Sequence, residues 1–223
     1  MSKATELAKK PNKKAKNSLK ALRREGELRR YRSPFCAGYW RDATRELKNP
    51  RVLSFSALMI ALCVALSFVP SIAISDGVKV TWGFLARAMC AMVGGPVNAL
   101  VFGAAEDTIS FLIHPTGAYF PGYTLTTMIG TFVYALFLYR QRVTVARIFL
   151  AKLANSVINL FLGSLWSAIL YSKGYLYYVV TRLVSYSVTL PIQVVLLSML
   201  IGALLPAFVR MGLHPPQEGL DTF

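Results

Sequence analysis

The sequence predicts an all-α polytopic membrane protein with six transmembrane helices and both termini in the cytoplasm. Hydrophobic residues make up 55% of the 223-residue chain, and its mean hydropathy is +0.48. The apolar residues are concentrated after residue 51 in long runs, and a helix needs roughly 20 such residues to cross a bilayer. The runs are unbroken, as in 52–69, whereas barrel strands alternate polar and apolar residues.

Six segments follow this pattern: about 52–74, 81–93, 97–113, 123–139, 146–171 and 176–205. They predict one membrane domain over 52–210. A basic cytoplasmic extension, 1–51, precedes it and a short cytoplasmic tail, 211–223, follows it. The second segment is short and runs directly into Gly94-Gly95-Pro96, so we expect neighbouring helices to shield its ends.

Positive charge gives the predicted orientation. Residues 1–51 contain 16 of the 25 Lys and Arg residues against five acids, an excess of +11. Lysine and arginine concentrate in cytoplasmic loops, so this extension is expected inside. Six crossings also place the connection between the fourth and fifth segments inside, and it contains Arg140, Arg142 and Arg147 without an acid.

The basic extension has two interpretations. A run such as 9–16 can bind nucleic acid, but a basic stretch that leads into a membrane helix more often meets anionic lipid. We therefore expect anionic membrane lipid, and no nucleic acid, as the partner of 1–51. The stretch from Ala37 to Lys48 contains Tyr39 and Trp40 followed by alternating charges, and it predicts a short interfacial helix.

Several kinds of chemistry find no support. Cysteine and histidine residues are scattered, so neither a disulfide framework, a metal site nor a cofactor is expected. No phosphate-binding loop of the form G-x-x-x-x-G-K-[ST] occurs, and the two halves show no convincing repeat. If the protein moves a solute uphill, an ATPase on another subunit is the better interpretation.

A break in the hydropathy pattern is the first candidate for a ligand site. Residues 114–123 read His-Pro-Thr-Gly-Ala-Tyr-Phe-Pro-Gly-Tyr, between two apolar runs. Irregular backbone at the rim of a membrane domain is tolerated only where protein or an aqueous cavity satisfies its hydrogen bonds. We expect this break to supply part of the lining of a ligand site.

Polar residues inside the apolar segments are the second indication. Charged groups at bilayer depth cost about 2.5–3.5 kcal/mol each on insertion scales, and they usually face a partner in the interior. Arg87 either pairs with Glu106 or Asp107 as a structural ion pair, or faces the ligand as a counter-charge. Asn155 and Asn159 share a helix face with Gly163, close to Trp166. That face suits a flat heterocycle, or it forms hydrogen bonds between helices.

The first and last segments add weaker signals. On the last segment Arg182 and Gln193 can contribute polar contacts, and Pro191 between them either exposes a carbonyl group to the ligand or bends the helix. On the first segment, small side chains recur every four residues and allow another helix to approach closely. That partner is either another subunit or one of the protein's own helices. The stripe consists of Ala57, Ala61 and Ala65.

These residues together resemble the substrate-binding S components of energy-coupling factor (ECF) vitamin transporters, folate type. The resemblance covers about 46–210, and the Tyr-Phe-Pro-Gly-Tyr core is its most specific part. The long basic extension departs from the compact members of the family. The matching motifs are Gly95-Pro96, 103–107, 114–125, 134–139, 164–166, 171–174 and 191–193.

The resemblance implies a subunit of the bacterial cell membrane that captures folate on the outer side, and not an enzyme. It implies a complex with a transmembrane coupling subunit, contacted by the alanine stripe, and with two ATPase subunits. Relatives in the broader family take other small molecules, including pantothenate and queuosine precursors. An intramembrane enzyme or a purely structural membrane subunit would be the alternatives, and ligand binding would separate them from an S component.

Folate makes a chemical prediction about the site. Its pterin and benzoate rings need aromatic or apolar neighbours, for which the candidates are Trp82, Phe84, Tyr119, Phe120, Tyr123 and Trp166. Its glutamate carboxylates need cations or donors, for which the candidates are Lys79, Arg87, Lys173 and Arg182. The expected substrate-binding set is completed by Pro121, Gly122, Asn159 and Gln193.

Overall fold

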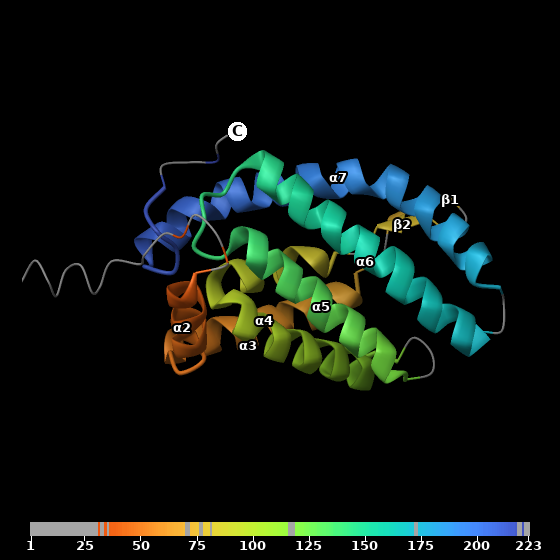
Figure 1. Cartoon of the computed structure of the whole chain (residues 1–223), viewed down its shortest axis with the longest axis horizontal. Coiled ribbons are helices and arrows are strands. Elements are labelled where there is room, and N and C mark those ends of the chain that lie inside the picture. The colour runs from red at the N-terminus through yellow and green to blue at the C-terminus, as the bar shows by residue number, and fades with distance from the viewer. Residues whose placement is uncertain are drawn as a thin grey trace, which may run out of the picture.

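The computed structural model describes residues 31, 34, 36–69, 72–75, 78–80, 82–115, 119–171, 174–217 and 220. Its elements are six helices and one short hairpin of two strands (Figure 1). In chain order they are α2 (Ala37–Glu46), α3 (Pro50–Ser67), β1 (Ile72–Ser75), β2 (Val78–Val80), α4 (Phe84–Ile113), α5 (Pro121–Leu138), α6 (Val145–Tyr171) and α7 (Tyr175–Arg210).

The prediction of an all-α polytopic fold is confirmed, and the hairpin is a local addition to it. The first segment, predicted over 52–74, is helical only to Ser67. Pro70 follows shortly afterwards in the sequence and disfavours helical backbone at the residue before it. Strands β1 and β2 then pair antiparallel, and β2 packs against α7. A helix is present where one was predicted from Ala37 to Lys48, as α2, and its interfacial position stays a prediction.

Helix α4 contains both the second and the third predicted segments. Its backbone leaves helical geometry at Gly95, which has φ +75° and ψ 179°. Arg87 and Glu106 lie 19 residues apart, which on a straight helix would separate them by about 28 Å. Their side chains are nevertheless 3.0 Å apart. The chain therefore reverses at Gly95, and 84–94 and 96–113 are two antiparallel halves.

The reversal reconciles two ways of counting the spans. Five helices are long and apolar enough to cross a membrane when α4 is counted once. Separating its halves gives the six predicted segments. The first half spans only about 16 Å at 1.5 Å per residue, so it does not cross a bilayer alone. Neighbouring helices cover it, because most of its side chains are buried.

Close packing around α4 depends on small residues. α4 contacts α2, α3, α5 and α7, and it lies between α3 and α5 in the bundle (Figure 1). A Cβ atom on Gly103 would lie 2.9 Å from the Cα atom of Met128, so only glycine allows α5 this close. At Gly95 a Cβ atom would lie 3.0 Å from the Tyr139 ring. The turn of α4 is thus pressed against the end of α5.

Both ends of the described chain meet at one end of the bundle. The Tyr31 amide donates to the Arg140 carbonyl oxygen at 2.9 Å. Gln217 exchanges two hydrogen bonds with the backbone of Val143, at 3.0 and 2.8 Å. An even number of crossings brings the two ends of a chain to the same side. This arrangement agrees with six segments, and we name this side the terminal end.

Candidate ligand-binding site

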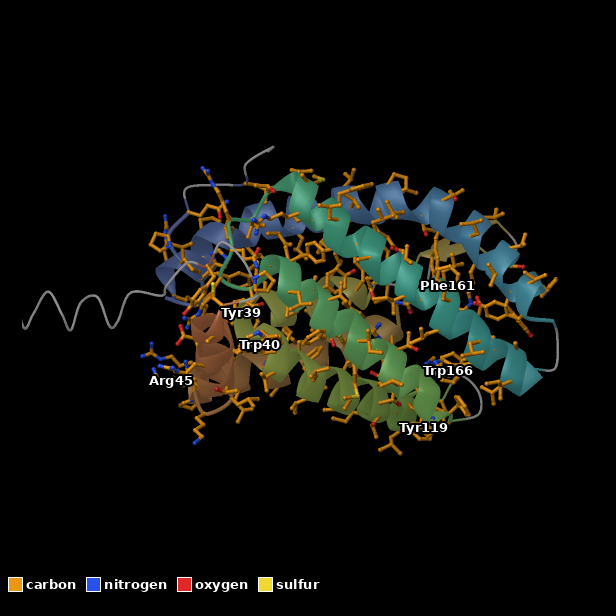
Figure 2. The ribbon with its side chains drawn as sticks, in the orientation of Figure 1. Tyr39, Trp40, Arg45, Tyr119, Phe161 and Trp166 are labelled. Atoms are coloured by element: carbon orange, nitrogen blue, oxygen red, sulfur yellow. The ribbon has the colours of Figure 1, made fainter. Side chains whose placement is uncertain are left out.

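One face of α6 carries a polar and aromatic stripe. Its five residues follow one another at spacings of three or four, which places them on one side of the helix. The stripe extends over about 21 Å at 1.5 Å per residue. The residues that α6 exposes elsewhere are largely apolar, and Phe161 is one of them (Figure 2). We define the α6 stripe as Lys152, Asn155, Asn159, Gly163 and Trp166.

Aromatic rings gather at the Trp166 end of the stripe. The Phe120 ring lies 5.5 Å from the Trp166 ring and 6.3 Å from the Tyr123 ring, centroid to centroid. The indole Nε1 of Trp166 donates to Thr126 Oγ1 at 2.9 Å and fixes the orientation of the ring. Three of the six predicted ring residues are therefore brought together by α5 and α6.

The Pro-Gly pair within the predicted break shapes this aromatic cluster. Pro121 occupies the first turn of α5, where its fixed φ favours helix initiation. Gly122 is buried, and a Cβ atom there would lie 2.5 Å from the Phe120 ring and 2.6 Å from the Trp166 ring. The two rings approach each other because position 122 has no side chain.

Helix α7 brings a cation to the same cluster. Arg182 Nη2 donates to Ser167 Oγ at 2.9 Å, and the Tyr123 hydroxyl lies 3.0 Å from the same oxygen. A Cβ atom on Gly163 would lie 2.6 Å from Arg182 Nη1, so the glycine of the stripe accommodates the guanidinium group. No described acid forms an ion pair with Arg182. Its charge is therefore open to an anionic ligand.

A second group of charges lies at the Lys152 end. Arg87 Nε and Nη2 donate to the two carboxylate oxygens of Glu106, both at 3.0 Å. The structural ion pair, one of the two alternatives for Arg87, is therefore present. The Arg87 side chain keeps 34% of its surface exposed, whereas Glu106 keeps 3%. Asp107 instead accepts hydrogen bonds from Thr124 and Thr127 of α5.

Lys152 is a cation that the sequence analysis missed. It is 6% exposed, and its Nζ lies 4.4 Å from the centre of the Phe84 ring. Among the residues that the structure describes it has no acidic partner, and Arg87 is within electrostatic range. The carboxylate of Glu106 is paired with Arg87, so it does not serve Lys152. A buried ammonium group is costly without a counter-charge, and an anionic ligand would supply one.

Between the two ends, the amides of the stripe contact one another and α5. Asn155 Nδ2 donates to the Tyr134 hydroxyl at 3.2 Å. A Cβ atom on Gly130 would lie 2.5 Å from Asn155 Oδ1. Asn159 donates to the backbone and side-chain oxygens of Asn155, at 2.9 and 3.0 Å. Hydrogen bonding between helices is thus shown for Asn155, and a ligand contact of Asn159 stays a prediction.

Three other predicted site residues have surroundings that do not assign them to the aromatic cluster. Tyr119 is 47% exposed, and its ring packs on Phe111 at 5.0 Å. Trp82 is half-buried ahead of α4. Gln193 is buried but follows Arg182 along α7 by about 16 Å. These three remain predictions.

Two predicted cations cannot be placed as side chains. Lys79 belongs to β2, of which the structure describes only the backbone. Lys173 lies outside the described residues. Both stay predictions.

The alanine stripe of α3 faces outward. Ala57, Ala61 and Ala65 are all exposed. The opposite face of α3 is the one that packs on the bundle, through Val52, Ser56, Met59 and Cys63. Packing of the stripe against the described helices is therefore excluded.

Known proteins are similar to this chain in sequence and in fold. No protein-family model matches the chain. The folate transporter FolT of Clostridium novyi (strain NT) is 34% identical over 152 residues, which cover 68% of this chain and 88% of that relative. FolT of Leuconostoc mesenteroides subsp. mesenteroides is 26% identical over 166 residues, covering 69% and 88%.

A solved structure extends the likeness to three dimensions. The crystal structure of FolT bound with folic acid matches with a TM-score of 0.61 and 28% identity. The match covers 68% of this chain and 94% of that chain. The C. novyi relative exceeds 30% identity over most of its own length, and the helical bundle agrees with the solved fold. The chain therefore belongs to the FolT family of folate-type S components.

Proposed function

We propose that this protein captures folate at the outer face of the bacterial cell membrane, as the substrate-binding S component of an ECF-type importer. The observation that carries the proposal is the α6 stripe, with an aromatic cluster at one end and, at the other, a buried cation that no described acid pairs with. The related FolT structure bound with folic acid supports the choice of ligand.

The chemistry of folate matches the two ends of the stripe. Its flat pterin and benzoyl rings would pack on Phe120, Tyr123 and Trp166, where ring stacking contributes beyond area burial. Its glutamate moiety has two carboxylates, and Lys152 is the described cation that most needs one. Arg182 is a second donor near the rings. Arg87 already has the carboxylate of Glu106, so its main role is to hold the two halves of α4 together.

The orientation follows from charge. Figure 2 shows Tyr119 and Trp166 at the end of the molecule opposite to Tyr39 and Arg45. The terminal end adjoins the basic extension, 1–51, which favours the cytoplasm. The aromatic cluster would then lie near the outer surface, where a nutrient arrives.

Transport requires partners in this proposal. The outward-facing alanine stripe of α3 would bind a transmembrane coupling subunit, because small side chains allow a partner helix to approach closely. Two ATPase subunits would supply the energy, since this chain has no phosphate-binding loop. The protein would act as a transporter subunit and not as an enzyme.

Calorimetry on the detergent-purified chain tests the proposal. Folate, pantothenate and a queuosine precursor are titrated in parallel. We expect one-to-one binding of folate with a dissociation constant in the micromolar range or below, and no heat of binding from the other two. Binding of another ligand alone would keep the transporter class and change the cargo. No binding of any of the three would contradict the proposal.

A further inference from the structure

The charges of α2 are sorted by the fold into an inner acidic side and an outer basic side. Asp42 Oδ2 accepts hydrogen bonds from Arg140 Nη1 and from the Tyr31 hydroxyl, both at 2.7 Å. Glu46 Oε1 accepts from Arg140 Nη2 at 2.5 Å. Both acids of the helix therefore face the connection between α5 and α6, where they share the charge of Arg140.

The cations of the same segment face away from the protein. Four of them are exposed within eleven residues, and the two acids of this stretch are the inward-facing Asp42 and Glu46. Figure 2 shows Arg45 extending from α2 at the terminal end. A sequence of alternating charges thus becomes a surface of one sign. We define this basic face as Arg41, Arg45, Lys48 and Arg51.

An aromatic side chain places the basic face at the level of a membrane surface. Trp40 is 39% exposed, and its ring lies 6.1 Å from the ring of Phe132 on α5. Tryptophan concentrates where a bilayer meets water. Pro50 starts the spanning helix α3 directly after the basic face, and Leu53 is already 55% exposed. The four cations therefore lie beside the polar rim of the apolar surface.

We propose that the basic face binds anionic phospholipid headgroups of the cytoplasmic leaflet. Basic residues beside a membrane span attract such lipids, and the attraction weakens as salt screens it. Arg140 favours this because it holds both acids on the inner side of α2 and offsets the charge of one of them. A lipid is favoured over an acidic protein because Trp40 and Leu53 adjoin the cations on the apolar surface. The proposal rests on the proposed orientation and is independent of the ligand.

Quenching of Trp40 fluorescence tests which lipid surrounds α2. The full-length chain is reconstituted in nanodiscs of phosphatidylcholine and phosphatidylglycerol at a fixed ratio, with bromine on the acyl chains of one lipid or the other. The signal of a Trp40→Phe variant is subtracted to isolate Trp40. We expect a preference of about fivefold for the anionic lipid near Trp40, falling when NaCl rises from about 0.1 to 0.5 M.

Two variants separate charge from structure. Arg41→Gln/Arg45→Gln/Lys48→Gln/Arg51→Gln removes the charge of the basic face. In this variant we expect the two brominated lipids to quench Trp40 fluorescence equally. Arg41→Lys/Arg45→Lys/Arg51→Lys keeps the charge and should keep the preference. Thermal unfolding of both variants reports whether the bundle is intact. Folate titration is carried out alongside, and a failure of the wild-type chain to bind folate would count against the proposed function and not against the lipid proposal.

Two results would overturn the proposal. One is equal quenching by both lipids in the wild-type chain. The other is a preference that survives removal of the four charges. If equal quenching is accompanied by salt-sensitive binding to the purified coupling and ATPase subunits that the glutamine variant loses, the basic face binds a protein and not lipid.

Discussion

The terminal end and the α6 stripe treat buried charge in opposite ways. At the terminal end, Arg140 meets two carboxylates from α2, and its positive φ of 48° is held by these contacts and by the bond from Tyr31 to its carbonyl. Along the α6 stripe, Lys152 lies over the face of Phe84 and forms no ion pair with a described acid. Paired charge holds helices together at the terminal end, whereas for Lys152 we propose a carboxylate of the ligand as the counter-charge.

Tyrosines extend this contrast at the terminal end. Burial raises the pKa of the Tyr39 and Tyr139 hydroxyls above their ordinary range, so both stay neutral. The Tyr39 hydroxyl donates to the Ala135 carbonyl oxygen at 3.1 Å, and the two rings meet edge to face at 5.3 Å. The terminal end is a closed structural junction with its buried ions paired.

The largest expected effect is at the ion pair inside α4. Arg87→Ala should lower the free energy of unfolding by about 3 kcal/mol, because it leaves the buried Glu106 carboxylate without its partner. The double variant Arg87→Gln/Glu106→Gln should recover most of that loss and keep folate affinity within about threefold. Thermal unfolding and calorimetry in detergent measure both. Folate binding lost in a stable double variant would instead make Arg87 a ligand contact.

A smaller loss is expected at the terminal end. Arg140→Ala should cost about 2 kcal/mol, because Asp42 and Glu46 lose their shared partner but lie close enough to water to be partly solvated. Folate affinity should not change. The matched control is Arg210→Ala, an exposed arginine at the end of α7. Equal thermal midpoints of the two variants would show that the Arg140 network does not stabilise the fold.

At the aromatic cluster we expect an effect on binding more than on folding. Gly122→Ala should weaken folate binding about tenfold, since the added Cβ overlaps the Phe120 and Trp166 rings and overpacking costs about 1–3 kcal/mol. Gly174→Ala is the control at the same end, because nothing lies within 4 Å of a Cβ atom there. Unchanged folate affinity in Gly122→Ala would place the ligand away from these rings.

The smallest effect on the isolated protein is expected at the alanine stripe. Ala61→Leu should leave stability and folate affinity unchanged, since the residue is exposed, but reduce co-purification of the coupling subunit. The same substitution at the exposed Ala203 of α7 is the control. Equal recovery of the coupling subunit with both variants would remove the stripe from the interface.

The sequence was sufficient for much of the fold and for part of the site. Hydropathy located the spans, and Gly94-Gly95-Pro96 marked the place where α4 reverses. It did not predict the hairpin, because β1 and β2 have only four and three residues and continue an apolar segment. Of the rings in the break at 114–123, Phe120 packs on Trp166 and Tyr123 lies next to Phe120, whereas Tyr119 packs on Phe111.

Lys152 is a site residue that the sequence analysis did not identify. In the run 145–171, Arg147 lies at the start of the helix and Lys152 is the cation further inside, and that signal was available from the sequence. The sequence did not show whether Lys152 has an acidic partner, because that depends on which helices face α6. Glu106 is committed to Arg87 only because α4 folds back on itself. Pairing between helices is therefore the information that the structure adds.

The most direct test of the account compares folate with pteroate, which lacks the glutamate moiety, on wild-type protein and on Lys152→Met. The methionine keeps the length and apolar contacts of the side chain and removes its charge. We predict that the variant binds folate about tenfold more weakly, the loss of one charge-assisted contact, and binds pteroate with nearly the wild-type affinity. Unchanged folate affinity in the variant, or an equal loss of affinity for folate and pteroate, would contradict the proposal that Lys152 binds a carboxylate of the ligand.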